Sequence, residues 1–330
     1  MILFLIVSND SIMKPPYDIS RVILRLVTSI SEKIGEVNAN FMNKPSPQLR
    51  KQNRIKTIHS SLSIEGNTLT REQVTAIIEN KRIIGPKKDV LEVINAVKVY
   101  DNLTMLNPFS STSFLKAHKL LMDGLIENPG KYRNQGVGIY QGLHVAHVAP
   151  PFENVPALMN DLFAYLKNKE ELILIKSCVF HYEMEFIHPF LDGNGRMGRL
   201  WQTLILMNEY PVFEFLPFET LISQTQNEYY EALGNSDKLG KSTPFIEYML
   251  SVIEKSLTEL LDFNNRILTH NDRLEYFMSL GKKEFTRKDY MKVFKDISTA
   301  TASRDLKKGV EMNLFERTGE MNKTIYRIKK

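Results

Sequence analysis

The sequence contains very little cysteine, since Cys178 is the single one among 330 residues. One thiol can form neither an intramolecular disulfide nor a thiolate metal cluster. This excludes the disulfide-stabilised secreted scaffolds and the structural zinc modules. A chain of this kind is typical of the reducing cytoplasm, which is the compartment that we expect. Cys178 itself lies in an apolar helical pattern without any partner.

Long hydrophobic runs are also missing. The apolar run at residues 1–7 is too short to span a bilayer, and it has neither a preceding basic residue nor a following small-residue cleavage site. We therefore expect no membrane partner and no export signal. Residues 1–12 suggest no function, and Met13, followed by Lys14-Pro15-Pro16-Tyr17, is an alternative start of the protein.

The chain has little excess of either charge sign, except for an excess of positive charge at the C-terminal end. The net charge is +5, and residues 271–330 hold 15 Lys and Arg against 9 Asp and Glu, so the remainder of the chain is nearly neutral. This asymmetry marks the C-terminal end as the part suited to an anionic partner such as DNA. Hydrophobic residues make up 43% of the chain, enough for a sizeable core and two or three domains.

The apolar residues mostly follow the three-and-four spacing of amphipathic helices, which predicts a mainly α fold. Such stretches occupy residues 19–34, 90–100, 114–125, 155–166 and 171–187. The exception is the segment 136–148, which mixes glycine with β-branched residues and ends before Pro150-Pro151. It predicts a small two-stranded β-hairpin flap.

After about Asn271 the pattern predicts a helix at 286–294, a helix at 298–308 and a hairpin at 314–328. This order resembles a winged helix-turn-helix module, whose second helix can enter a DNA major groove. The side chains that we expect to face DNA are Ser298, Thr299, Thr301, Ser303 and Arg304. Dimerisation or binding of another partner is an equally open role for such a module.

The segment that carries chemistry is residues 188–199, which begin at a histidine after a helix and end in a new helix. Gly193 and Gly195 flank Asn194 at the start of that helix. A glycine-rich turn that opens a helix binds anions, because its backbone N–H groups and the positive end of the helix dipole face the ligand. Arg196 and Arg199 lie on neighbouring helical positions and can contact successive phosphates.

Two further side chains complete the candidate site. Asp192 offers a hard oxygen ligand that could hold Mg²⁺ against phosphate oxygens. His188, with an unperturbed pKa near ~6.5, can accept the proton of an attacking hydroxyl at neutral pH. Phe190 is expected to anchor the loop in the core. His181 suggests a second metal ligand by its spacing, but its apolar face favours a hydrogen-bonded core histidine.

The motif His-Pro-Phe-x-Asp-Gly-Asn-Gly-Arg-x-Gly-Arg resembles the full signature of the Fic family of AMP-transferases. The resemblance extends from roughly Ser110 to Met249 and includes the sequence 130–133, Pro150-Pro151 and the sequence 227–230. It implies a Fic-type helical bundle with a flap, ATP and Mg²⁺, and a target protein, or the protein itself, modified on a Tyr, Thr or Ser hydroxyl.

The resemblance also implies a role for each motif residue. His188 would be the general base and Asp192 the magnesium ligand, and the β- and γ-phosphate contacts would come from Arg196 and Arg199. Asn194 and the amides of Gly193 and Gly195 would hold the α-phosphate. A related branch that transfers phosphate has lysine in place of the second glycine, so Gly195 favours nucleotidyl transfer.

Two less specific assignments lie outside the motif. Tyr229 and Tyr230 are candidates for the border of the adenine pocket, although aromatic residues on a helix are at least as often core residues. In the flap, His144, Val145 and His147 are candidates for aligning the target by strand addition.

A second resemblance lies upstream, at the end of a predicted helix at about 55–66. Ser61-Leu-Ser-Ile-Glu65-Gly66 matches the inhibitory motif of the Fic family, in which the glutamate pairs with the second motif arginine. Here the pair is Glu65 and Arg199. A buried carboxylate that faces this arginine would occupy it and repel the γ-phosphate. Glu65 could also orient a water that removes AMP again.

We expect three regions: 1–105 with the inhibitory helix, a catalytic core at 106–265 and a winged helix-turn-helix at 266–330. A DNA-binding regulator that uses the core as a nucleotide sensor is the alternative from another class. A transferase that uses UTP, GTP or a phosphocholine carrier is a third hypothesis, and self-association as a homodimer is left open.

Overall fold

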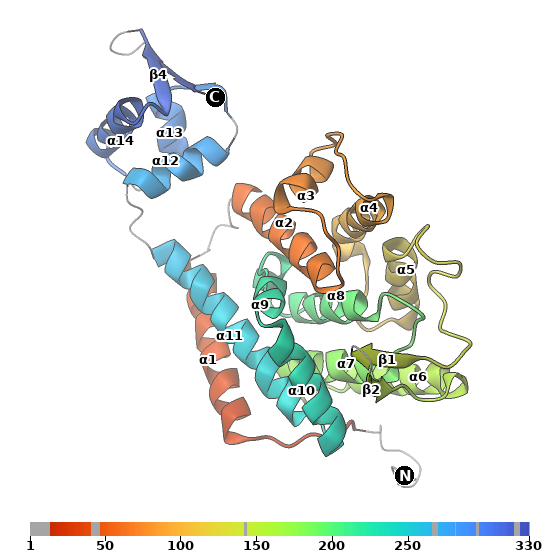
Figure 1. Cartoon of the computed structure of the whole chain (residues 1–330). Helices are drawn as coiled ribbons and strands as arrows, with labels where there is room; N and C mark the ends of the chain where they lie inside the picture. Colours follow the sequence, from red (N-terminus) through yellow and green to blue (C-terminus); the bar gives the residue numbers. More distant parts are fainter. Residues whose placement is uncertain are drawn as a thin grey trace. The chain divides into compact units, whose positions relative to one another are not determined.

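The computed structural model describes residues 14–40, 47–141, 144–265, 270–280, 282–294, 297–319 and 324–329, and the chain divides into two compact units, 1–261 and 262–330 (Figure 1). The segment 1–12, for which the sequence suggested no function, lies outside the described residues. The first unit contains the predicted N-terminal region and the predicted catalytic core up to residue 261. The boundaries 105/106 and 265/266 stay predictions.

The first unit is mainly helical, as predicted. Its helices are α1 (Arg21–Asn40), α2 (Pro47–Ile64), α3 (Arg71–Ile78), α4 (Lys87–Asp101), α5 (Ser111–Leu121), α6 (Val155–Lys167), α7 (Ile173–Ile187), α8 (Asn194–Met207), α9 (Glu219–Gln224), α10 (Gln226–Leu239) and α11 (Thr243–Asn265). Three short 3₁₀ turns lie at η1 (Leu103–Met105), η2 (Phe152–Asn154) and η3 (Pro211–Glu214). Within the described ranges, no helix has the length and apolar character needed to cross a bilayer.

The centre of this unit is the antiparallel pair formed by α7 and α8, which pack along one another. Helix α7 is buried on nearly all sides, as expected of a helix whose sequence is apolar all round. Phe114 of α5 contacts Phe163, Phe180 and Trp201 edge to face, which locks α5, α6, α7 and α8 together. This rigid centre carries the loop between α7 and α8.

Helix α5 ends earlier than predicted. The apolar spacing predicted a helix up to residue 125, but α5 ends at Leu121, Met122 leaves the helical conformation and Gly124 has φ +71°. Met122 is nevertheless fully buried, because its side chain packs against Gly193 in front of α8. The apolar residue at 122 reflects this tertiary contact, not a further helical turn.

The predicted flap is confirmed as a two-stranded antiparallel hairpin. Strand β1 (Gly138–Gln141) pairs with β2 (His144–Val148), and the register shifts between Ile139 and Tyr140. Strand β2 lies beside α10. The hairpin therefore lies beside the helix that carries Tyr229 and Tyr230.

The second unit has its own core and contains the helix, helix and hairpin predicted from the sequence. Its elements are α12 (His270–Ser279), β3 (Glu284–Phe285), α13 (Arg287–Val293), α14 (Thr299–Glu311), β4 (Phe315–Thr318) and β5 (Ile325–Ile328). The three strands form an antiparallel sheet in the order β3-β5-β4. A buried ion pair joins Arg273 of α12 to Asp305 of α14, with an Nε–Oδ2 distance of 2.6 Å. The winged-helix assignment stays a prediction.

Candidate functional site

The loop between α7 and α8 is closed by its own side chains. Gly193 precedes α8 with φ +87°, and a β-carbon there would lie 2.7 Å from Met122 Sδ, so this position requires glycine. The Asn194 side chain accepts a hydrogen bond from the Phe190 N–H and donates one to the Phe190 carbonyl, both at 2.9 Å. Both polar atoms of the Asn194 side chain are thus hydrogen-bonded within the loop. The backbone N–H of Asn194 is the group of this residue that can bind an anion.

A buried histidine that was not among the candidates from the sequence holds this loop by hydrogen bonds. His118 of α5 is fully buried, its Nδ1 accepts the Gly130 N–H at 2.8 Å, and its Nε2 lies 3.0 Å from the Asp192 carbonyl oxygen. Burial lowers the pKa of His118 to about 4, so the ring is neutral at pH 7. Because Nδ1 is an acceptor, Nε2 carries the proton and donates a hydrogen bond to the backbone carbonyl of Asp192. The ring also stacks on Phe190, with centroids 3.6 Å apart.

His188 is the last residue before the loop and takes a left-handed conformation with φ +50°. Its ring is half-buried, and Nδ1 lies 3.4 Å from the Glu185 carbonyl oxygen. A proton on Nδ1 in that contact makes Nε2 the basic nitrogen of the ring.

Arg133 connects His188 to the base of the flap. The Arg133 side chain is buried and donates to the carbonyl oxygens of His188 at 2.8 Å, Gln135 at 3.0 Å and Pro150 at 2.5 Å. Its backbone N–H donates to Pro189 at 2.8 Å. Gln135 precedes β1 and Pro150 follows β2, so one arginine ties both ends of the flap to the backbone of the candidate base.

Arg199 of α8 is completely buried and contacts the end of α2. Its Nη2 donates to Glu65 Oε1 at 2.7 Å and to the Ser61 carbonyl at 2.9 Å, and its Nε donates to Ser61 Oγ at 3.1 Å. Burial lowers the pKa of Arg199, but the charge and hydrogen bond of Glu65, together with the charges of Tyr229 and Glu185, more than offset this, so the pKa is raised. The Glu65 side chain is 26% exposed, so the expectation of a buried carboxylate is wrong and the arginine is the buried partner.

Glu65 also lies directly on the first turn of α8. A β-carbon on Gly195 would stand 2.3 Å from Glu65 Oε1 and 3.1 Å from Arg199 Nη1. Only glycine allows this approach. The first N–H groups of an α-helix have no partner within the helix, so the carboxylate stands where an anion would bind.

Arg196 has different partners. It is buried, its Nη2 donates to Asp192 Oδ1 at 2.8 Å, and its Nη1 donates to Glu92 Oε1 at 2.9 Å. Glu92 lies on α4, 104 residues before Arg196 in the chain, and no local sequence pattern marks it. The Asp192 side chain remains 47% exposed at the edge of the loop.

The prediction that His181 is a hydrogen-bonded core residue is confirmed. It is fully buried, with Nδ1 2.7 Å from Gln202 Oε1 and Nε2 3.1 Å from the Tyr229 hydroxyl. Among the described residues, no group of three or more His, Cys, Asp and Glu is placed to hold a metal ion. Tyr229 is buried, with its hydroxyl against His181 of α7, whereas Tyr230 is 38% exposed. Tyr229 is therefore a core residue. The role of Tyr229 and Tyr230 at the adenine pocket stays a prediction.

The burial of His181 predicts acid sensitivity. Burial lowers the pKa of His181 to about 3, whereas the unfolded chain titrates near the usual value of 6.5. Between these values the unfolded state binds a proton that the folded state does not, so stability falls as the pH falls. From pH 7 to pH 5 we expect a loss of about 2 kcal/mol in the free energy of unfolding from this residue. Urea unfolding of wild type and His181→Gln measures it.

The two proteins are compared by the slope of the free energy of unfolding against pH, because every other titratable group is the same in both. The His181→Gln variant should show the shallower loss of stability on acidification. Parallel curves for the two proteins would mean that His181 is protonated in the fold, contrary to its burial.

The three flap candidates lie on β2. His144 pairs with Gln141, Val145 with Tyr140 and His147 with Ile139 across the hairpin. The side chains of these residues are outside the described part of the structure, so their contact with a target stays a prediction.

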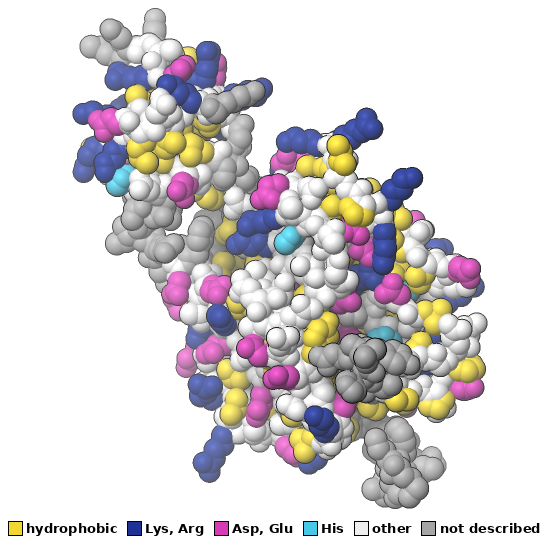
Figure 2. All heavy atoms as spheres, in the orientation of Figure 1, with side chains coloured by type: hydrophobic (Ala, Val, Ile, Leu, Met, Phe, Trp, Pro, Cys, Tyr) yellow, Lys and Arg dark blue, Asp and Glu magenta, His cyan; other side chains and the backbone are white. Residues whose placement is uncertain are grey.

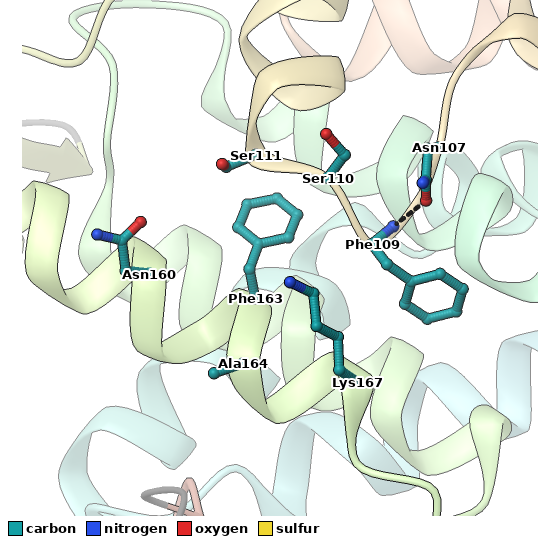
Figure 3. Close-up of a pocket in the computed structure, with 8 residues that line it drawn as sticks. All are labelled: Asn107, Phe109, Ser110, Ser111, Asn160, Phe163, Ala164 and Lys167. Atoms are coloured by element: carbon teal, nitrogen blue, oxygen red, sulfur yellow. Dashed lines mark hydrogen bonds between the residues drawn. The ribbon is translucent and has the colours of Figure 1, made fainter.

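A depression of about 550 Å³ lies between the start of α5 and α6, away from the motif (Figure 3). Two of its polar side chains are used locally, since Asn107 Oδ1 accepts the Phe109 N–H and Ser110 Oγ caps α5. None of its lining residues belongs to the motif or to the segment 61–67. The motif lies instead at the junction of α7 and α8, where the Glu65 carboxylate stands against Gly195.

Comparisons with known proteins agree with this geometry. Residues 108–206 match the model of the Fic/DOC family. A Fic family protein of known structure from Desulfovibrio desulfuricans G20 is 40% identical with a TM-score of 0.75, and the match covers 96% of this chain and 98% of that one. Fic-1 from C. elegans shares the fold at 23% identity and a TM-score of 0.61, over 73% of this chain and 72% of that one.

Curated relatives are similar over about 70% of the chain. A protein named protein adenylyltransferase Fic from Nematostella vectensis is 29% identical over 250 residues, which is 70% of this chain and 55% of that protein. One of the same name from Drosophila erecta is 29% identical over 71% of this chain and 47% of its own length. The chain therefore spans about half the length of the curated relatives it matches.

The motif loop, the helical bundle that carries it and a 40% identical relative matched along nearly its whole length lead to one conclusion. This chain belongs to the Fic family.

Proposed function

We propose that this protein transfers AMP from ATP to a Tyr, Thr or Ser hydroxyl of a target protein or of itself. The observation that carries the proposal is the junction of α7 and α8, where a histidine ends one helix and a glycine-rich first turn with two arginines opens the next. The names of the curated relatives, protein adenylyltransferase Fic, support the same reaction.

In the proposed reaction, the target hydroxyl oxygen attacks the α-phosphorus of ATP in line with the leaving group. His188 accepts the hydroxyl proton, the new bond joins the oxygen to phosphorus, and the bond to pyrophosphate breaks. The amides of the first turn of α8, including Gly195, hold the α-phosphate. Arg199 contacts the outer phosphates once Glu65 has left it.

Magnesium fits the residues present. Mg²⁺ is usually held by one or two carboxylates together with substrate phosphates, not by a full cage of protein ligands. Asp192 provides one such carboxylate, half exposed at the loop edge. When bound there, Mg²⁺ would neutralise phosphate charge.

We further propose that Glu65 and Ser61 inhibit this activity. Together they accept three hydrogen bonds from Arg199, and the Glu65 carboxylate stands against Gly195. An incoming γ-phosphate would compete with Glu65 for the same guanidinium and meet its negative charge. A second role for Glu65, orienting a water that removes AMP, would use the same position.

The test is intact-mass analysis of the Glu65→Gly protein incubated separately with ATP, GTP or UTP and Mg²⁺, and with a phosphocholine donor. We expect an adduct with the mass of AMP, formed with ATP and lost in the additional variant His188→Ala. No adduct with any donor would contradict the proposal, and an adduct from another donor would identify that donor instead. The single, buried Cys178 supports a reducing cytoplasm as the setting.

The alternative of a regulator with a catalytically silent core is not favoured. A nucleotide sensor needs the phosphate contacts but has no use for a base, and His188 is present with its backbone fixed by Arg133.

We propose a second function for the C-terminal unit, which is binding of duplex DNA through α14. Figure 2 shows Lys and Arg side chains gathered on this unit. The exposed side chains of α14 include Thr299, Arg304, Lys307 and Lys308, while Ala302, Asp305 and Leu306 are buried. Of the hydroxyls expected to face DNA, Ser298 caps α14 and Ser303 accepts a hydrogen bond from Arg287, so the basic residues are the favoured contacts.

We expect salt-dependent binding of a 30-base-pair duplex that the double variant Arg304→Ala/Lys307→Ala weakens. Removal of one side chain that binds a phosphate should reduce the slope of log affinity against log salt by about 0.9, and this variant should therefore reduce it by about 2. Fluorescence anisotropy over a salt series measures it. The matched control removes two exposed lysines of the first unit, Lys169→Ala/Lys238→Ala, and should leave the slope unchanged. A wild-type protein that binds no duplex at low salt would contradict the proposal.

A further inference from the structure

Glu92 is a buried carboxylate that contacts both Asn67, the residue after the inhibitory motif 61–66, and Arg196 of the motif 188–199. Its side chain is almost fully buried on α4, where Oε1 accepts from Arg196 Nη1 at 2.9 Å and Oε2 accepts from Asn67 Nδ2 at 2.8 Å. An ionised carboxylate removed from water is tolerated only when it is paired and hydrogen-bonded. Both oxygens of Glu92 meet this requirement, so its position is tightly defined.

The guanidinium of Arg196 is shared between two carboxylates. One terminal nitrogen donates to Glu92 and the other to Asp192, at 2.9 and 2.8 Å. Arg199, by contrast, forms an ion pair with one carboxylate in the described part of the chain, that of Glu65. Two negative partners leave Arg196 little positive potential for a phosphate, so the two motif arginines are suited to different tasks.

The result of these linked hydrogen bonds is a fixed Asp192. His118 Nε2 holds its carbonyl oxygen, and Oδ1 accepts from both Arg196 and the Gly193 N–H, the latter at 2.6 Å. Within the described residues, Oδ2 accepts no hydrogen bond, and the side chain is 47% exposed. Two donors therefore hold Oδ1, and Oδ2 is the oxygen that a cation could bind.

We propose that Glu92 is a positioning residue of the cation site: it holds Arg196 against Asp192 and thereby presents the second Asp192 oxygen to the divalent cation of the nucleotide. This inference rests on the proposed function, and it deepens the assignment of Asp192. It gives Arg196 the task of orienting Asp192, in place of the β- and γ-phosphate contact that the motif implied. Residues that orient a metal ligand typically change metal affinity by ~10–100-fold when they are replaced.

The test measures binding without catalysis. α,β-Methylene-ATP has no scissile bond at the α-phosphorus, so its affinity for the full-length Glu65→Gly protein can be measured by calorimetry with Mg²⁺ and with EDTA. The ratio of the two affinities is the contribution of the cation. In the variant Glu65→Gly/Glu92→Gln, we expect this ratio to fall by ~10-fold while the affinity in EDTA is unchanged. A general disturbance of the fold would lower both affinities together.

A double-mutant cycle with Asp192→Asn shows whether Glu92 acts through Asp192. Once Asp192→Asn has removed the cation ligand, Glu92→Gln should cause no further loss in the ratio. Additive losses would overturn the proposal, and so would an unchanged ratio in Glu92→Gln or the absence of any Mg²⁺ effect in the parent protein. Glu219→Gln is the matched control, because it replaces another fully buried, hydrogen-bonded glutamate of the same unit and should leave the ratio intact.

Arg196→Lys provides a second route if Glu92→Gln is unstable. Lysine keeps the charge but is a point donor that cannot bridge two carboxylates in the fixed geometry of a guanidinium. We expect it to lower the ratio and to leave the affinity in EDTA unchanged. If Arg196 is a phosphate contact instead, the affinity in EDTA falls and the inference fails. A Glu65→Gly protein that shows the predicted Mg²⁺ linkage and yet transfers no AMP would contradict the proposed function alone.

Discussion

The Glu65→Gly variant should transfer AMP from ATP about 10²-fold faster than the wild-type protein. A hydrogen bond to a charged group is worth ~1.5–3 kcal/mol, which corresponds to ~10–10²-fold, and Arg199 becomes available to phosphate when Glu65 is removed. Removal of the carboxylate from its place against Gly195 also abolishes the repulsion of the phosphate chain. The initial rate of labelling of the protein or of its target by labelled ATP measures the effect.

Two further variants show whether the charge of Glu65 is responsible. Glu65→Gln keeps the shape and the hydrogen-bonding capacity of the side chain but removes its charge, so its rate should lie between those of wild type and Glu65→Gly. Glu72→Ala removes an exposed glutamate from the neighbouring helix α3 and should leave the rate unchanged. Equal rates for wild type and Glu65→Gly would disprove the inhibitory role.

Replacement of His188 should reduce transfer by ~10²–10⁴-fold in the Glu65→Gly background, because general base catalysis typically contributes that much. The contacts proposed for the nucleotide lie on α8 and involve Arg199 and the backbone of the first turn. Nucleotide affinity should therefore remain within a few-fold of the parent protein. Rate assays at saturating ATP, together with calorimetry using the α,β-methylene analogue, separate the two quantities.

The backbone at His188 determines which substitutions are informative. Its φ of +50° is unfavourable for most residues, but asparagine adopts this region several-fold more often than other non-glycine residues. His188→Asn therefore preserves the conformation and removes the base, whereas His188→Ala adds backbone strain. We expect both variants to lose transfer and His188→Asn to unfold at the higher temperature of the two. Transfer that survives in His188→Asn would exclude His188 as the base.

Much of the helical fold could be predicted from the sequence, because a buried stripe repeats with the period of the helix itself. The helices from Val155 to Lys167 and from Ile173 to Ile187 follow that pattern closely. The prediction was wrong at the end of α5, where Met122 is buried by contact with the loop before α8. Periodicity cannot distinguish burial against a neighbouring element from burial on the same helix.

The parts of the site that lie within one loop and one helical turn could also be predicted. His188, Asp192 and the glycines are separated by a few residues, so local spacing sets their relation. His118, Arg133 and Glu92 could not be assigned their contacts, because each reaches the loop from another helix or from the base of the flap. A single buried histidine or glutamate on a helix carries no sequence signal of the group that it will meet.

The sequence by itself determined the family, the mainly helical architecture and the order of groups along the motif, since these depend on residue types at short spacing. Only the tertiary structure decided that Arg199 is buried against Ser61 and Glu65, and that Arg196 is divided between Glu92 and Asp192. The physical reason is that a guanidinium takes whichever carboxylates the packing of helices brings within hydrogen-bonding distance, and that packing joins residues more than a hundred positions apart.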